Sequence, residues 1–491
     1  MTTQHTTIVF DQPGPGGWKQ LADHFPAALT PEYQRLFSEN CPTGMAKYMA
    51  RYGVLARSVD VAFVHGHLYI TPVPVFGPRE SRRTPPTAVV WVVARLHPEF
   101  RRRTRAAANA LAERPWRAAA THWFETERAQ WQTRNEALQA IDPAGMTAEE
   151  LVGHVRACRG LVADGYERHF DLHGDDLLPI GLLIARCAEW GIDAATAMSA
   201  LSGASPLSAG TVEPAAWQLV TGYDLDSLAW AELPNRPSQR VAHPVEPLDL
   251  HPLVPVAHHG ELDALVADAR TAVPLRDDNG AFTAAWPMGL LRRAMLAAGR
   301  CLGFDDPSLA VELTTDELIA LLQGGTTPSS LDITVRRAER DRMTQLDAPN
   351  AIGPEFAIPP LSALPRALAR IGAAQLATAD HMLIADGGTG IGIGTRPYTG
   401  RALVVDDPAT AMDLIEPGDV VITRCTSPSW NSILLHAGAL VTTTGGLVSH
   451  AAVIARELDI PAIIGDASAF DRLTTGMIVT VDPVLVSVTS S

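Results

Sequence analysis

One histidine in the sequence stands where its neighbours could make it a nucleophile. Ser449 precedes His450 and is a residue type that commonly caps a helix, so a helix is expected to begin at about His450. Free backbone N–H groups and the helix dipole favour an anion at such a position. The same field disfavours imidazolium, so we expect the His450 side chain to stay neutral. A neutral imidazole beside an anion cradle can attack phosphorus and hold a phosphoryl group.

The elements that position this histidine follow from the local sequence. Four residues around the turn before the helix form the expected phosphate-binding loop: Thr442, Gly445, Gly446 and Ser449. The glycines allow a tight turn and close approach of the backbone. The helix is expected to run to about Leu458, because Pro461 blocks its continuation. Arg456 lies two turns along this helix, and we expect a structural role for it, such as a salt bridge within the domain.

The amino-acid composition argues against several classes of protein. The chain has 491 residues and a formal net charge of −15, which predicts two to four domains and argues against a general nucleic-acid binder. No stretch approaches the roughly 20 apolar residues of a membrane span, and the N-terminus lacks signal-peptide features. We therefore expect a cytoplasmic protein with no membrane partner. The five scattered cysteines predict neither disulfides nor a zinc site, and we expect no bound metal.

The predicted secondary structure changes along the chain. Residues 1 to about 95 are mixed, two helical blocks follow at about 98–200 and 260–345, and short strands alternate with helices from 395 onward. The glycine-rich residues 386–394 are expected to form a hinge. We predict an α/β multidomain fold: a mainly helical substrate-binding domain over 1–385 and a β/α domain over 395–491.

A long segment from Val441 to Gly465 resembles the phosphohistidine swivelling (mobile) domain of the phosphoenolpyruvate-utilizing enzyme family, which includes phosphoenolpyruvate synthase and rifampin phosphotransferase. The shared string is VTTTGGLVSHAAVIARELDIPAIIG. The segment from Pro417 to Trp430, with its T-x-P-x-W turn, supports the same resemblance. The pattern departs from the family near Val481-Asp-Pro-Val, which puts the last hairpin in doubt. By this resemblance, His450 is the phosphorylated residue.

The resemblance extends more weakly upstream, to the substrate-binding region of the rifampin phosphotransferase group. It implies an acceptor domain without the family's ATP-grasp domain. We therefore expect a separate ATP-grasp protein as partner, with ATP or phosphoenolpyruvate as phosphoryl donor and magnesium held by that partner. No firmly bound cofactor is expected on this chain.

Four residues are candidates for an acceptor site. Asp23 and His24 could line the pocket, or serve as a helix cap and a surface histidine. His169 and His173 lie at i and i+4 on an expected helix, a spacing that can bind a metal or supply a general base, although a structural role is favoured.

Three functions remain open from the sequence. The first is a phosphotransferase component that passes a phosphoryl group from His450 to a hydroxyl of a small organic acceptor. The second is a dehydratase that phosphorylates a hydroxyl and then eliminates it. The third is a non-catalytic binding or regulatory homologue whose histidine is never phosphorylated.

Overall fold

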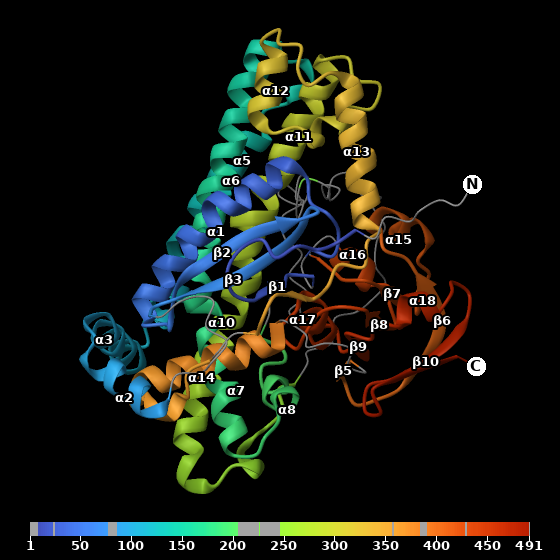
Figure 1. The fold of residues 1–491 in the computed structure, drawn as a ribbon. Helices are drawn as coiled ribbons and strands as arrows, with labels where there is room; N and C mark the ends of the chain where they lie inside the picture. The colour runs from blue at the N-terminus through green and yellow to red at the C-terminus, as the bar shows by residue number, and fades with distance from the viewer. Residues whose placement is uncertain are drawn as a thin grey trace.

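The computed structural model describes residues 8–22, 25–76, 86–204, 225, 246–355, 358–382, 390–427 and 430–490. A small sheet and a set of long helices make up the N-terminal part, and a second sheet with short helices makes up the C-terminal part (Figure 1). The helical N-terminal region and the C-terminal sheet agree with the expected α/β fold class.

The small sheet lies on the flank of the long helices (Figure 1). Its strand order is β2-β3-β1-β4, and its members are β1 (Trp18–Gln20), β2 (Ala56–Val64), β3 (His67–Pro74) and β4 (Ala351–Ile352). All of its pairings are antiparallel. His65 and Gly66 join β2 to β3 with positive φ values of 51° and 82°, which suits the twist of a two-residue hairpin.

Long helices form the body of the N-terminal part. They are α1 (Pro31–Tyr52), α2 (Thr87–Leu96), α3 (Pro98–Glu113), α4 (Pro115–His122), α5 (Arg128–Gln139), α6 (Ala148–Asp176), α7 (Leu178–Glu189), α8 (Ala194–Ser199), α10 (His259–Gly280), α11 (Trp286–Cys301), α12 (Thr315–Leu322), α13 (Ser330–Thr344) and α14 (Arg366–Met382). Helices α1 and α6 pack side by side, and Arg159 of α6 reaches the fully buried Glu32 of α1 at 2.7 Å. Side-chain caps fix several boundaries: Thr314 begins α12 with a capping box to Glu317.

The C-terminal sheet has the order β11-β10-β6-β7-β8-β9-β5. Its four central strands are parallel: β6 (Tyr398–Val404), β7 (Val420–Thr423), β8 (Ala439–Thr442) and β9 (Ala462–Ile464). Strands β7 and β8 are buried along their whole length, as expected of parallel strands covered on both faces. The accompanying helices are α15 (Pro408–Leu414), α16 (Asn431–Leu434), α17 (His450–Glu457) and α18 (Ala469–Arg472).

The structure differs from the sequence-based prediction at residues 386–394, which are expected to form a hinge. Residues 391–393 of the 386–394 segment form strand β5 (Ile391–Ile393), which pairs antiparallel with β9. Three-residue pairing ties this half of the segment to the C-terminal sheet, so it is not a hinge. Residues 386–389 lie outside the described part of the chain. The doubtful last hairpin is present, because β10 (Ile478–Asp482) pairs with β11 (Ser487–Ser490).

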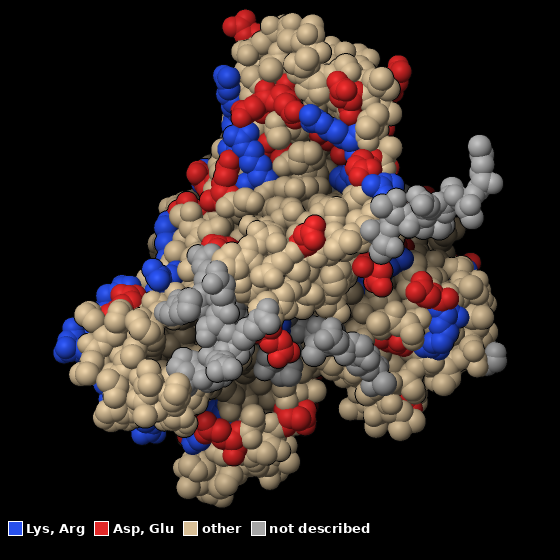
Figure 2. All heavy atoms as spheres, viewed as in Figure 1, with Lys and Arg blue, Asp and Glu red and all other residues tan. Residues whose placement is uncertain are grey.

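Charged side chains of both signs alternate on the face drawn in Figure 2. The arginine-rich run at 101–105, which could be taken for a solvated helix face, contains one buried member. Arg103 is 2% exposed and donates to the backbone oxygens of Met49 at 3.0 Å and Ala56 at 2.7 Å. It therefore satisfies carbonyl groups at the end of α1 and at the start of β2. Among the described helices, none combines the length and apolarity needed to span a membrane.

Candidate functional site

Helix α17 begins at His450, as the sequence predicts. The Ser449 hydroxyl accepts a hydrogen bond from the backbone N–H of Ala452 at 3.3 Å, and this caps the helix. Gly445 adopts a φ of 112°, and a Cβ there would lie 3.0 Å from Ser449 Oγ. Only glycine therefore fits the turn that brings β8 into the helix. His450 itself is half-buried.

Sheet topology explains what surrounds the His450 ring. Strands β7 and β8 are parallel and in register, with Thr423 opposite Thr442 at their carboxyl ends. The segments that follow both strands therefore meet at one edge of the sheet, where open α/β sheets commonly bind ligands. The segment after β7 supplies Thr426 and, in α16, Asn431; the segment after β8 supplies His450.

Both ring nitrogens of His450 have polar partners. Nδ1 lies 2.8 Å from the Thr426 hydroxyl, and Nε2 lies 2.8 Å from Asn431 Oδ1. An amide oxygen can only accept, so Nε2 carries the proton in this arrangement, and the Thr426 hydroxyl can donate to Nδ1. A nucleophilic ring nitrogen needs a free lone pair, which in this tautomer only Nδ1 has, so the Thr426 contact must open before the ring can react.

The other residues that the sequence places around this turn make different hydrogen bonds in the structure. The Thr442 hydroxyl is fully buried and donates to the Thr444 carbonyl at 2.7 Å, so it holds the loop together and does not face a ligand. Gly446 accepts a hydrogen bond from the Ser449 N–H through its carbonyl at 2.9 Å. Arg456 donates to the Leu447 carbonyl at 2.8 Å, which ties the helix to the loop before it.

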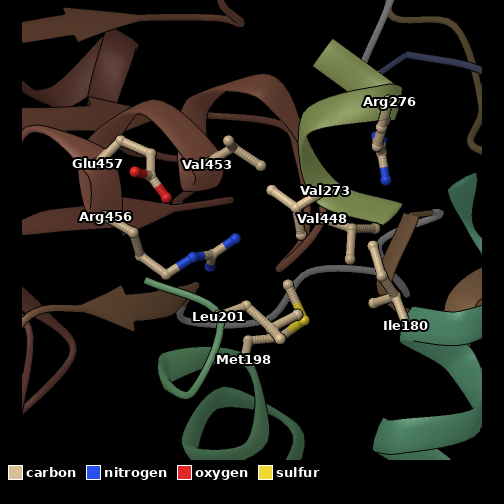
Figure 3. Close-up of a pocket in the computed structure, with 9 residues that line it drawn as sticks. All are labelled: Ile180, Met198, Leu201, Val273, Arg276, Val448, Val453, Arg456 and Glu457. Carbon is tan, nitrogen blue, oxygen red and sulfur yellow. The ribbon is translucent and has the colours of Figure 1, made fainter. Parts of the chain in front are cut away.

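Helix α17 lies against the helical part of the chain. A narrow pocket at this contact has one wall from α17 and the opposite wall from α10, α7 and the α8 region (Figure 3). Further along the same boundary, the Thr444 hydroxyl lies 3.5 Å from the Ala22 carbonyl. The histidine-bearing loop therefore touches both the start of the chain and the long helices.

His169 and His173 share one face of α6, with ring centroids 4.8 Å apart. His169 Nδ1 lies 2.7 Å from Asn279 Oδ1 of α10, and Asn279 Nδ2 donates to Asp176 at 3.3 Å. His173 Nδ1 faces the fully buried Asp176 at 3.6 Å. Among the described residues, no three His, Cys, Asp or Glu side chains are grouped to hold a metal ion. At 3.6 Å the contact between His173 and Asp176 is longer than a hydrogen bond, and His173 Nδ1 is buried without a hydrogen-bond partner among the residues that the structure describes.

A second buried carboxylate lies beside this pair. Asp175 accepts a hydrogen bond from the Tyr52 hydroxyl and pairs with Arg51 at 3.0 Å. Burial raises the pKa of Asp175 to about 6, although Arg51 works in the opposite direction. Burial also raises the pKa of the Tyr48 hydroxyl, and the charge of Asp176 adds to that shift. Helix α1 thus closes one side of this polar cluster.

The sequence found some of these residues and missed others. Asp23 and His24 lie outside the described residues, so their acceptor-site role stays a prediction. Thr426 belongs to the T-x-P-x-W segment, which could have pointed to it. Asn431 carries no signal of its own beyond following Trp430, because its approach to His450 depends on how β7 and β8 pair.

Comparisons with known proteins agree with this geometry. Residues 415–484 match the family described as the PEP-utilising enzyme, mobile domain. The chain is 43% identical over 93 residues to the uncharacterized phosphotransferase YvkC of Bacillus subtilis, and 47% identical over 92 residues to phosphoenolpyruvate synthase of Escherichia coli. It is 41% identical over 92 residues to phosphoenolpyruvate synthase of Aquifex aeolicus. Each match covers 19% of this chain and 11% or 12% of the relative.

Proposed function

We propose, from the premise that residues 415–484 form the mobile domain of a phosphoenolpyruvate-utilizing enzyme, that this protein is a phosphotransferase component carrying a phosphoryl group on His450. The observation that carries the proposal is the place of His450. It begins a capped helix at the carboxyl edge of a parallel sheet, with its ring between Thr426 and Asn431. This arrangement can hold a neutral imidazole in one orientation.

The reaction has two transfers. A ring nitrogen of His450 attacks a donor phosphorus, a nitrogen–phosphorus bond forms, and the donor's phosphorus–oxygen bond breaks. The acceptor oxygen then attacks the same phosphorus, the nitrogen–phosphorus bond breaks, and the proton of the acceptor hydroxyl passes to a general base. The donor is ATP or phosphoenolpyruvate, delivered through a separate ATP-grasp protein that holds the magnesium.

The acceptor is a hydroxyl of a small organic molecule bound by the helical part. Helix α10 contacts both α17, which begins at His450, and the polar cluster on α6. Its residues Val273 and Arg276 line the contact with α17, and Asn279, one turn further, touches His169 and Asp176. His173, whose ring lies 3.6 Å from the Asp176 carboxylate, is our candidate for the general base. Part of its side chain, 17%, stays exposed.

Intact-mass measurement at neutral to basic pH tests the carrier role. The protein is incubated with ATP alone, with phosphoenolpyruvate alone, and with ATP plus an ATP-grasp protein from the same organism. A gain of one phosphoryl group is expected in at least one mixture, and His450→Ala should abolish it. His251→Ala, which removes an exposed histidine of the helical part, should retain it. No gain in any mixture, or a gain that survives His450→Ala, contradicts the proposal.

A further inference from the structure

The pocket between α17 and α10 has an uncommon chemical composition (Figure 3). Val273 and Arg276 of α10 form one wall, and Val453, Arg456 and Glu457 of α17 form another. The remaining walls are apolar side chains from α7 and the α8 region. Two guanidinium groups and one carboxylate therefore border a largely apolar space, which leaves an excess of one positive charge.

Arg276 is the anomaly in this pocket. Its Nη1 is fully buried and has no hydrogen-bond partner among the described residues, and no ion pair to its guanidinium is found there either. Other inward-facing arginines of the helical part do have partners: Arg103 donates to backbone carbonyls, and Arg340 pairs with Glu312 at 2.8 Å. A buried guanidinium nitrogen without a partner costs free energy, and a ligand that offers it an acceptor oxygen would remove that cost.

The neighbours of Arg276 do not satisfy it. Arg456 carries the same charge and donates to the Leu447 carbonyl. Glu457 lines the same pocket and has an interaction of its own. In Figure 3, Glu457 lies beside Arg456 on the α17 side, and the Arg276 guanidinium lies on the α10 side. An incoming anion would meet Arg276 without displacing an existing partner.

We propose that Arg276 binds a small anionic group of the acceptor, a carboxylate or a phosphate, at the contact between α10 and α17. A guanidinium presents a planar fork of donors that matches both oxyanions. The enclosed space is about 10 Å³, which is room for one water-sized group. That room takes a single oxygen of the carboxylate or phosphate, so the rest of the anionic group stays outside the enclosed space. The assignment of the anion to the acceptor rests on the proposed function, whereas anion binding itself needs no phosphoryl transfer.

Calorimetric titration of the full chain with inorganic phosphate, and separately with acetate, tests the anion site at constant ionic strength. Saturable binding of at least one anion is expected, with an affinity at least tenfold weaker in Arg276→Gln and an intermediate loss in Arg276→Lys. Arg300→Gln, an exposed arginine of α11, is the matched control and should bind as the unmodified protein does. The two arms tell a phosphate-bearing acceptor from a carboxylate-bearing one. Binding of neither anion, or equal binding by Arg276→Gln, overturns the proposal.

A thermal-unfolding measurement without added anion gives a second, independent test. Because Arg276 lacks a partner, Arg276→Met should leave the melting temperature unchanged or raise it. A fall of several degrees would mean that Arg276 serves packing, and would overturn the proposal. Both measurements use unphosphorylated protein without a donor. Their failure is therefore distinguishable from failure of the carrier role, which the mass measurement tests by itself.

Discussion

The two polar centres of this molecule are built in opposite ways. His450 meets Thr426 and Asn431, which are 24 and 19 residues away in the sequence. The cluster in the helical part joins Tyr52 to Asp175 across 123 residues and His169 to Asn279 across 110. The first centre is a local motif on a parallel sheet, and the second depends on how three long helices pack. A motif of the first kind can be identified from a short match, whereas the second leaves almost no trace in the sequence.

The comparison predicts that a change in the local motif abolishes phosphoryl loading and leaves the helical part folded. Gly445→Val should lower the loading rate at least a thousandfold, because its φ of 112° and the nearby Ser449 Oγ exclude a branched side chain. Intact-mass time courses measure this rate.

Gly476→Ala is the matched control for Gly445. Gly476 also has a positive φ, 96°, but its Cβ would meet no atom within 4 Å. An alanine at this position has the same unfavourable positive φ but no steric clash, so the loading rate of Gly476→Ala should change little. Equal losses in both variants would show that general destabilisation of the sheet, and not the turn, controls loading.

The helical cluster should instead set a pH dependence of stability. The folded-state pKa of Asp175 is raised to about 6 from an ordinary 3.8, so the folded state holds a proton that the unfolded state releases. The contribution of Asp175 is therefore most favourable below pH 4 and is lost as pH rises through 6. Relative to Asp175→Asn, the unmodified protein should lose about 2 kcal/mol of unfolding free energy between pH 4 and 7.

Urea unfolding of the two proteins at several pH values measures this difference. Asp164→Asn, which changes a carboxylate that is 63% exposed, is the control and should show no comparable trend. A difference that is flat with pH would mean that Asp175 does not hold the proton assigned to it.

A smaller change should tune the local site without destroying it. Asn431→Asp places a carboxylate 2.8 Å from Nε2 and favours imidazolium, which has no lone pair for attack. We expect loading about tenfold slower at pH 7, with most of the loss recovered at pH 9, as the ring loses its extra proton. Asn431→Ala should show no such recovery. The same pH profile in both variants would assign Asn431 a purely steric role.

The smallest effect concerns a local feature of the helical part. Thr314→Ala removes the capping box of α12 and should lower the unfolding free energy by about 1 kcal/mol. Thr334→Ala, an exposed threonine inside α13, is the control, with an expected change near zero. A cost at Thr334 equal to that at Thr314 would show that the cap adds nothing to stability.

These elements show what the sequence can and cannot predict. The cap at Ser449 and the start of α17 depend on neighbouring residues, and the structure has them as predicted. The sequence predicts a hinge where the structure has strand β5. The local pattern does not show this strand, because its partner β9 lies some 70 residues further along.

The polar contacts depend on the same kind of distant pairing. The sequence places Thr442 in the phosphate-binding loop, whereas in the structure its hydroxyl donates a hydrogen bond to the Thr444 carbonyl. Asn431 and Arg276 were missed because each depends on packing between segments that no local pattern describes.

The place of β5 sets a geometric limit on the C-terminal part. Helix α14 ends at Met382, and the described chain resumes at Gly390 just before β5. Eight residues of chain reach at most about 28 Å when fully extended. Any excursion of the sheet therefore keeps the start of β5 within that radius of α14. A sphere of this size corresponds to a local concentration of the start of β5 around α14 on the order of 10 mM.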